Sequence, residues 1–256
     1  MPWSGRLILA AGSVLDQPAE MVIEAAAFAG FDGVGLRLSG EHAVERPERV
    51  RARVEQAGLT VFDVEVHRIS ADADPRPLLD AASAVGAEAV LVVSDLRDRG
   101  ATIEQLHRVA AECRLRDLRL GLEYMAWTDP ADPLHAVAMA ESVGCEVLVD
   151  VLHHLRVGCG PPELAAVVAS GRLGWVQLCD APLAPPDGPF PEGLIREARH
   201  GRLAPGHGEL PIAELLAVLP PTVTVAIEVQ SDELLAVPVG LRAQHLIDTA
   251  RRALVR

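Results

Sequence analysis

The chain has 256 residues, of which 50% are hydrophobic and 23% are charged, and its formal net charge is −13. All 23 basic residues are arginine, which excludes a Schiff-base aldolase, a lysine-anchored pyridoxal phosphate enzyme and a P-loop nucleotide site, because each needs a lysine amine. The acidic balance and the 3% aromatic content argue against nucleic acid as a partner, since such binding depends on neutralising phosphates and stacking bases.

Strand-like and helix-like segments alternate along the whole chain. Continuous apolar runs, typical of parallel strands buried on both faces, occur at Arg6–Ala11, Gly33–Leu38, Thr60–Val66, Ala89–Val93, Arg119–Tyr124, Glu146–Asp150, Leu173–Leu178 and Val223–Val229. Helical spacing of apolar residues is found between them, at Pro18–Ala29, Glu41–Ala57, Arg76–Val85, Thr102–Arg116, Pro133–Val143, Pro161–Ser170, Ile212–Leu219 and Gly240–Val255.

Prolines and glycines that typically start or end helices stand at these boundaries. Pro18 and Pro133 stand near helix starts, and Gly58, Gly86 and Gly144 follow helical stretches, where a left-handed cap is common. Eight strand–helix units in about 250 residues match a (β/α)8 TIM barrel. We therefore predict an α/β fold with one barrel domain over residues 1–256. A doubly wound open sheet is the alternative, but no Gly-x-Gly-x-x-Gly follows the first strand.

One segment interrupts the alternation. Residues Ala181–Glu209 are rich in Pro and Gly and contain no long apolar run. A loop of this length inside a compact domain is usually a lid, a binding loop or a disordered stretch. It follows the seventh strand, on the barrel face where active sites are built, so we predict a lid-like active-site loop over 181–209. A solvated surface insertion is the alternative.

Polar side chains end the last four predicted strands. In a barrel, Glu123, Asp150, Gln177 and Glu228 would lie around one mouth. Burying three carboxylates together is costly unless a cation neutralises them, and oxygen donors favour Mg²⁺ or Mn²⁺ over zinc. Any one of these acids could instead cap a helix or pair with an arginine. Asp180 is a competing ligand, or the residue that starts the loop.

Together with these strand ends, the run from Ala29 to Val34, A-G-F-D-G-V, resembles the xylose isomerase-like TIM-barrel superfamily, in the sugar phosphate isomerase/epimerase group. Its relatives include D-tagatose 3-epimerase, hydroxypyruvate isomerase and 3-dehydroshikimate dehydratase. The resemblance implies a divalent metal, Mn²⁺ or Mg²⁺, held by Glu123, Asp150, Gln177 and Glu228. Many epimerases have histidine where this chain has Gln177, whereas relatives similar to hydroxypyruvate isomerase have glutamine.

Two further residues follow from the resemblance. The segment Asp150–His153 matches the family's Asp-x-x-His, which implies that His153 binds a substrate oxygen near the metal. Arg202 has the family's spacing to Pro205–Gly206, which implies that its guanidinium reaches the substrate. His207 replaces a frequent glutamate.

The second and third strands supply two more candidates. Relatives often carry an acidic residue at the end of the third strand that contacts substrate or supports the site, and Glu65 stands there. Arg37, at the end of the second strand, would either meet an anionic substrate or pair with Glu65. We predict both as substrate-binding residues.

The resemblance implies an isomerase or epimerase that removes a proton next to a carbonyl of a ketose or polyhydroxy ketone, through an enediolate. Glu123 and Glu228 would take and return the proton. A metal-dependent lyase or dehydratase, acting on a dehydroshikimate, an inosose or a keto-glycoside, is the main alternative, and a non-catalytic barrel is another. The related endonuclease IV is set aside, because it needs a histidine-rich zinc site and a basic face.

The remaining expectations concern location and assembly. The four cysteines form no C-x-x-C pair, which favours a reduced, cytoplasmic protein. No apolar run reaches the roughly 20 residues of a membrane span, and no leader pattern is present, so no membrane partner is expected. Relatives vary in oligomeric state, which leaves a homo-oligomer open.

Overall fold

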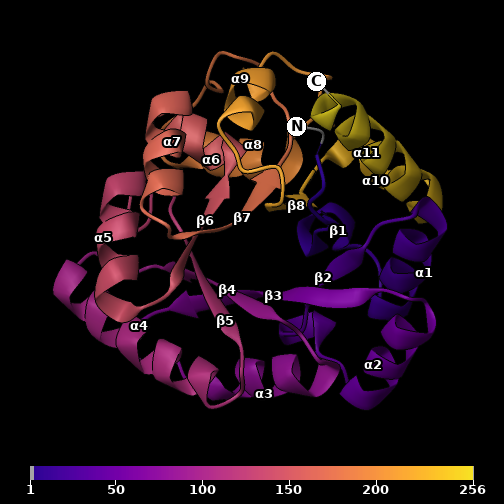
Figure 1. The fold of residues 1–256 in the computed structure, drawn as a ribbon, viewed down its shortest axis with the longest axis horizontal. Helices are drawn as coiled ribbons and strands as arrows, with labels where there is room; N and C mark the ends of the chain where they lie inside the picture. Colours follow the sequence, from indigo (N-terminus) through magenta and orange to yellow (C-terminus); the bar gives the residue numbers. More distant parts are fainter. Residues whose placement is uncertain (1–2, 256) are drawn as a thin grey trace.

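Eight parallel strands form a closed barrel in the computed structural model, which describes residues 3–255 (Figure 1). Each strand pairs with its neighbour in sequence, and the last pairs with the first, so that the barrel has no free edge. The single (β/α)8 barrel is confirmed, and the open sheet is wrong. The strands are β1 (Leu7–Leu9), β2 (Gly33–Arg37), β3 (Thr60–Ile69), β4 (Ala89–Ser94), β5 (Arg119–Glu123), β6 (Glu146–Asp150), β7 (Leu173–Leu178) and β8 (Thr224–Ile227).

Helices surround the barrel (Figure 1). They are α1 (Ala19–Ala29), α2 (Pro47–Gln56), α3 (Arg76–Val85), α4 (Arg99–Arg114), α5 (Pro133–Val143), α6 (Val151–Arg156), α7 (Pro161–Ala169), α8 (Glu192–His200), α9 (Ile212–Ala217), α10 (Asp232–Leu235) and α11 (Val239–Leu254). Short 3₁₀ helices are η1 (Ala11–Val14) and η2 (Gly40–His42).

Several elements differ from the predicted pattern, and the short helices η1, α6 and α10 were not predicted. The stretch expected as one helix over Glu41–Ala57 contains η2 and then α2. The non-helical Arg46 precedes α2, because Pro47 occupies the first turn of α2 and disfavours a helical residue before it. The segment expected as a loop over 181–209 contains helix α8. Its closing over the site as a lid stays a prediction.

Large apolar side chains fill the half of the barrel interior that lies toward the amino-terminal ends of the strands. Phe62 on β3 and Trp175 on β7 come from opposite sides of the barrel and meet edge to face, with ring centroids 5.4 Å apart. Gly121 on β5 makes room for this contact, since a Cβ there would lie 2.0 Å from the Trp175 ring. The larger apolar cluster packs the outer faces of the strands against the helices.

The amino-terminal end of the barrel is closed by ion pairs. Arg6 binds Glu88, and Arg119 binds Glu146, at the beginnings of the strands. Both guanidinium groups also lie over the Phe62 ring, at 5.1 and 5.8 Å from its centroid. Buried polar side chains are therefore left to gather at the opposite end, where the strands finish.

Candidate active site

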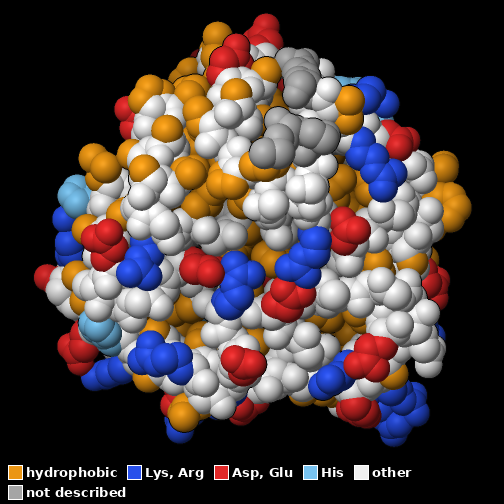
Figure 2. Space-filling model, viewed as in Figure 1, with side chains coloured by type: hydrophobic (Ala, Val, Ile, Leu, Met, Phe, Trp, Pro, Cys, Tyr) orange, Lys and Arg blue, Asp and Glu red, His pale blue; other side chains and the backbone are white. Residues whose placement is uncertain are grey.

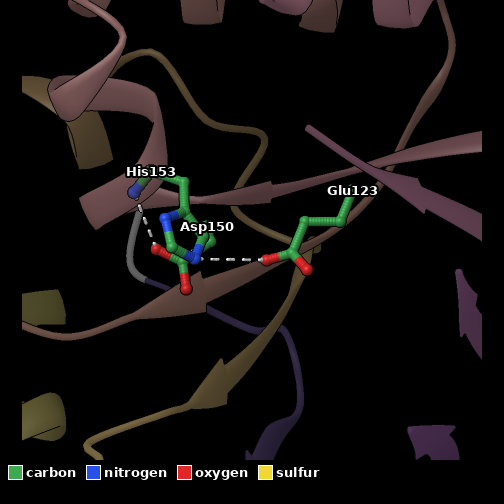
Figure 3. A group of neighbouring side chains, drawn as sticks. All are labelled: Glu123, Asp150 and His153. Atoms are coloured by element: carbon green, nitrogen blue, oxygen red, sulfur yellow. Dashed lines mark hydrogen bonds and ion pairs between the residues drawn. The ribbon is translucent and has the colours of Figure 1, made fainter. Parts of the chain in front are cut away.

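Three side chains at the carboxyl ends of β5 and β6 form a group that could hold a metal ion. Glu123 ends β5, Asp150 ends β6, and His153 lies in the first turn of α6 (Figure 3). One potential ligand atom from each lies within 4.8 Å of the others. Asp150 Oδ1 accepts the backbone N–H groups of Leu152 and His153 at 2.8 and 3.1 Å, which caps α6 and fixes His153 beside the carboxylates.

Arg202 enters this group from the segment between α8 and α9. Its Nη1 donates to Asp150 Oδ2 at 2.5 Å and lies 3.2 Å from Glu228 Oε2. Its Nε donates to the Ala198 carbonyl at 2.8 Å, and the side chain is 2% exposed. Arg202 therefore joins two of the predicted metal ligands through one buried positive charge. The predicted lid segment thus delivers a residue to the barrel mouth.

The carboxyl groups of the site have very different pKa values because their surroundings differ. Burial and the charges of Asp150 and Glu228 raise the pKa of Glu123 well above its usual range. Burial also raises the pKa of Glu228 to about 8, although Arg202 opposes this. Asp150 differs: burial disfavours its charge, but Arg202 and His153 outweigh that effect and hold its pKa at about 2.

His153 is a neutral ring at physiological pH. Burial lowers its pKa to about 4, with the nearby Arg202 charge adding to the effect and Asp150 opposing it. Its Nε2 lies 3.8 Å from Glu123 Oε1 and 3.5 Å from Arg202 Nη2. Trp127 packs edge to face against the ring, at 5.2 Å between centroids. A neutral imidazole offers a lone pair to a cation or a hydrogen bond to a substrate oxygen.

A second set of contacts crosses the barrel mouth. Glu65 on β3 accepts a hydrogen bond from Gln177 Nε2 at 3.2 Å, although β3 and β7 are diametrically opposite. Its other oxygen lies 3.5 Å from Arg37 Nη2. Of the two roles expected for Arg37, the structure shows the pairing with Glu65. Burial and Asp63 raise the pKa of Glu65 to about 7, with Arg37 opposing them.

Sequence reasoning missed Asp63. Its side chain is 0% exposed, and neither oxygen has a hydrogen-bond partner among residues 3–255. Burial and the charge of Glu228 raise its pKa to about 7. The available signal was an acidic residue two positions before Glu65 on the same strand, since side chains two positions apart lie on the same face of a strand.

Asp180 has a structural role. Its Oδ1 accepts the backbone N–H groups of Ala181 and Leu210 at 2.8 and 3.1 Å, and its Oδ2 accepts that of Gly206 at 2.9 Å. Of the two roles open to it, the structure supports the start of the 181–209 segment. This anchoring holds the turn that follows Arg202, and hence the approach of Arg202 to the rim.

The predicted ligands lie on consecutive strands of one rim. Asp150 and Gln177 are register partners of β6 and β7, and the Glu228 backbone N–H donates to Leu178 at the end of β7. Gln177 Oε1 is buried and has no hydrogen-bond partner among the described residues. An amide oxygen left without a donor beside carboxylates suits a divalent cation, although the His/Cys/Asp/Glu group whose ligand atoms come together among the described residues is Glu123, Asp150 and His153, without Glu228.

A cavity of about 550 Å³ lies beside the rim, next to Arg37. Its walls come from η1, the start of α1, the end of β2 and the chain around η2. Apart from Arg37, the charged residues that line it are mainly acidic: Asp16, Glu20, Glu41 and Glu45. This lining suits hydroxyl groups better than a second anion.

The outer surface carries charges of mixed sign. On the face drawn in Figure 2, arginine and acidic side chains lie next to each other, with no broad basic area. Over the described residues, no helix combines the length and the apolar character that crossing a bilayer requires.

Comparison with known proteins identifies the architecture. Residues 23–232 match a family described as xylose isomerase-like TIM barrel. No protein with a curated description matches the sequence. A xylose isomerase-like TIM barrel/4-hydroxyphenylpyruvate dioxygenase fusion protein is similar in structure, with a TM-score of 0.79 and 22% identity. The match covers 96% of this chain and 42% of that protein, so the chain corresponds to less than half of it.

Two other solved structures match over nearly the full length of both chains. The IOLI protein, solved with a bound zinc atom, has a TM-score of 0.82 at 12% identity, over 97% of this chain and 98% of its own. A D-allulose 3-epimerase from Methylomonas sp., solved with D-allulose, has a TM-score of 0.71 at 15% identity, over 99% of both. At such identities these likenesses show the fold.

Proposed function

Because the chain belongs to the xylose isomerase-like TIM-barrel family, we propose that it is a divalent-metal-dependent isomerase or epimerase of a ketose or polyhydroxy ketone. The reaction is removal of a proton from the carbon next to a carbonyl, followed by its return to a neighbouring carbon or to the opposite face. The observation that carries the proposal is the group of Glu123, Asp150 and His153, with ligand atoms within 4.8 Å of one another.

Glu123 and Glu228 are the acid and base of the proposal. They stand on β5 and just after β8, on either side of the rim, and burial raises the pKa of both carboxyls. A carboxyl that accepts a proton from the substrate and gives it back typically contributes about 10²–10⁴-fold to a rate. One group serves each face of a substrate held between them.

The remaining residues orient the substrate and balance its charge. Asp150 stays ionised beside Arg202, and the Arg202 guanidinium stabilises negative charge that develops on a substrate oxygen. Neutral His153 holds a second oxygen. A divalent cation bound at Glu123, Asp150, Gln177 and Glu228 would polarise the carbonyl and so lower the pKa of the adjacent C–H bond.

The absence of lysine and the acidic cavity beside Arg37 support an unphosphorylated polyol substrate. The same parts would expel a β-hydroxyl if the substrate carried one, so a lyase is the main competing outcome of the test below.

The test is incubation of the enzyme in D₂O with ketoses, inososes and 3-dehydroshikimate, with NMR detection. We expect deuterium at the carbon next to the carbonyl, without loss of water, and loss of this exchange after treatment with EDTA and its return with Mn²⁺ or Mg²⁺. An alkene or aromatic product would indicate the lyase instead. Exchange that survives exhaustive EDTA treatment would overturn the metal mechanism.

Two variants sharpen the test. Glu228→Gln removes the proposed acid/base group and should abolish exchange while the far-ultraviolet circular dichroism spectrum is unchanged. Glu104→Gln is the matched control, because Glu104 is an exposed acid on α4 that pairs only with Arg108. It should exchange at the wild-type rate, and a Glu228→Gln enzyme as fast as this control would remove Glu228 from the mechanism.

A further inference from the structure

The side chain of Gln177 has two ends of similar shape and opposite chemistry. The amide oxygen offers lone pairs, whereas the amide nitrogen carries two N–H donors and has no lone pair to offer a cation. A glutamine therefore serves as a ligand in only one of its two orientations. A residue that fixes this orientation decides whether Gln177 can bind a cation.

Glu65 makes the contact that fixes it. The Gln177 nitrogen donates to Glu65 Oε1 at 3.2 Å, and both side chains are 1% exposed. In its ionised form the Glu65 carboxylate accepts hydrogen bonds and donates none, so the reversed amide would place two acceptor oxygens 3.2 Å apart without a proton between them. The nitrogen consequently faces Glu65.

The free end of the amide is correspondingly unsatisfied. Gln177 Oε1 is buried and has no hydrogen-bond partner among residues 3–255. A buried acceptor without a partner is costly, so this oxygen is available to a cation. Its strand neighbour in register is Asp150, which places Gln177 next to the carboxylates of the rim.

Glu65 is itself held in place from a third strand. Arg37 Nη2 lies 3.5 Å from Glu65 Oε2, and the Arg37 side chain is only 26% exposed. The guanidinium compensates the burial of the Glu65 charge and directs one carboxylate oxygen toward β2 and the other toward β7.

We propose that Glu65 is a positioning residue that turns the amide oxygen of Gln177 toward the cation, with Arg37 holding the Glu65 carboxyl in place. The inference rests on the proposed metal-dependent function. It assigns Glu65 a role through Gln177 rather than a direct contact with substrate. Groups that orient metal ligands through hydrogen bonds typically change metal affinity by about 10–100-fold when they are mutated.

The test is a double-mutant cycle on Mn²⁺ affinity, measured at pH 8 by the loss of the free Mn²⁺ electron paramagnetic resonance signal. Glu65→Gln removes the carboxylate but keeps the size of the side chain, and Gln177→Ala removes the ligand whose orientation is at issue. We expect Glu65→Gln to weaken Mn²⁺ binding about 10–100-fold in the wild-type background. In the Gln177→Ala background its effect should be at least fivefold smaller, because no amide remains to be oriented.

A matched control separates orientation from charge. Asp63→Asn removes a buried negative charge from the same strand, but Asp63 makes no hydrogen bond to Gln177. Its effect on Mn²⁺ affinity should be the same in both backgrounds. The metal-free protein gives a second readout: the Gln177 side-chain amide, assigned by ¹⁵N NMR, should exchange with solvent faster after Glu65→Gln.

The outcomes are distinguishable. If the wild-type protein binds no Mn²⁺, both the proposed function and the inference fail. If it binds Mn²⁺ and Glu65→Gln has the same effect in both backgrounds, the positioning role alone is overturned. A Gln177 amide that exchanges equally fast with and without Glu65 also overturns it.

Discussion

Arg202 Nη1 and Asp150 Oδ2 lie 2.5 Å apart at the centre of the barrel mouth, with both side chains at most 2% exposed. Asp150 comes from β6, whereas Arg202 comes from a segment that leaves the barrel after β7 and returns to it. The contact therefore fastens the 181–209 segment to the rim through one buried ion pair. It also gives the carboxylates a positive charge that belongs to the protein itself.

We expect Arg202→Met to destabilise the metal-free protein by about 3–5 kcal/mol, because breaking a buried pair leaves uncompensated charge. Added Mn²⁺ should raise the melting temperature of this variant more than that of the wild type, since a cation replaces the missing charge. Thermal unfolding with and without Mn²⁺ measures both effects.

Arg108→Met is the control for this variant, because Arg108 pairs with Glu104 on the exposed face of α4 and such pairs contribute less than about 1 kcal/mol. Equal melting temperatures for the Arg202 and Arg108 variants would contradict the prediction.

Asp63→Asn should stabilise the protein above neutral pH. Burial raises the pKa of Asp63 from 3.8 to about 7, so the protonated carboxyl is favoured in the folded state. Its stabilising contribution is complete below pH 3.8 and is lost as the pH rises toward 7, by at most about 4 kcal/mol. Urea unfolding at pH 4 and pH 8 should show a smaller decrease for the variant than for the wild type.

An Asp63→Asn protein that loses as much stability as the wild type between these pH values would show that other carboxyls, such as Glu65 and Glu228, carry the dependence. Both of these also have a raised pKa.

Gly121→Ala should be strongly destabilising. A Cβ at this position would lie 2.0 Å from Trp175, which is fully buried and is packed against Phe62. Overpacking of a tight core typically costs about 1–3 kcal/mol or more. Gly240→Ala in α11 is the control, because its nearest neighbour would be at 3.6 Å and alanine favours the helix. Thermal unfolding of the two variants should differ in sign.

Asp180→Ala should loosen the 181–209 segment. It removes the acceptor of three backbone N–H groups, from Ala181, Gly206 and Leu210, and each unsatisfied group costs about 1–3 kcal/mol. Limited proteolysis should cut this segment faster than in the wild type. Asp187→Ala, in the exposed part of the same segment, should leave the cleavage rate unchanged, and equal rates for the two variants would count against the anchor.

The barrel could be predicted because the apolar runs and the polar residues that end them follow a local rule. Glu123 and Asp150 are the last residues of β5 and β6, where the sequence predicted them. Contacts across the barrel could not be predicted. The hydrogen bond between Glu65 and Gln177, for example, joins positions 112 residues apart and depends on side-chain length and direction. Asp63 was missed for a different reason, because the candidate residues were those that end the strands, whereas Asp63 lies inside β3.

Helix α8 was missed because the prolines and glycines on both sides of it make the whole 181–209 segment resemble a loop. Pro191 directly precedes it and many prolines and glycines surround it, although Glu197 and Ala198 give it a buried face. Arg156 stabilises that face by pairing with Glu197 at 2.6 Å, a tertiary contact that no local pattern shows.

The closed end formed by Phe62, Trp175 and the Arg6 and Arg119 ion pairs separates two tasks within one barrel. The amino-terminal half of the barrel interior is an apolar core that stabilises the fold, and it shares no side chain with the polar rim at the carboxyl end. Exchanging a rim residue should therefore leave the packing of Phe62 and Trp175 unchanged, and its effect on stability should be limited to the contacts of the rim itself.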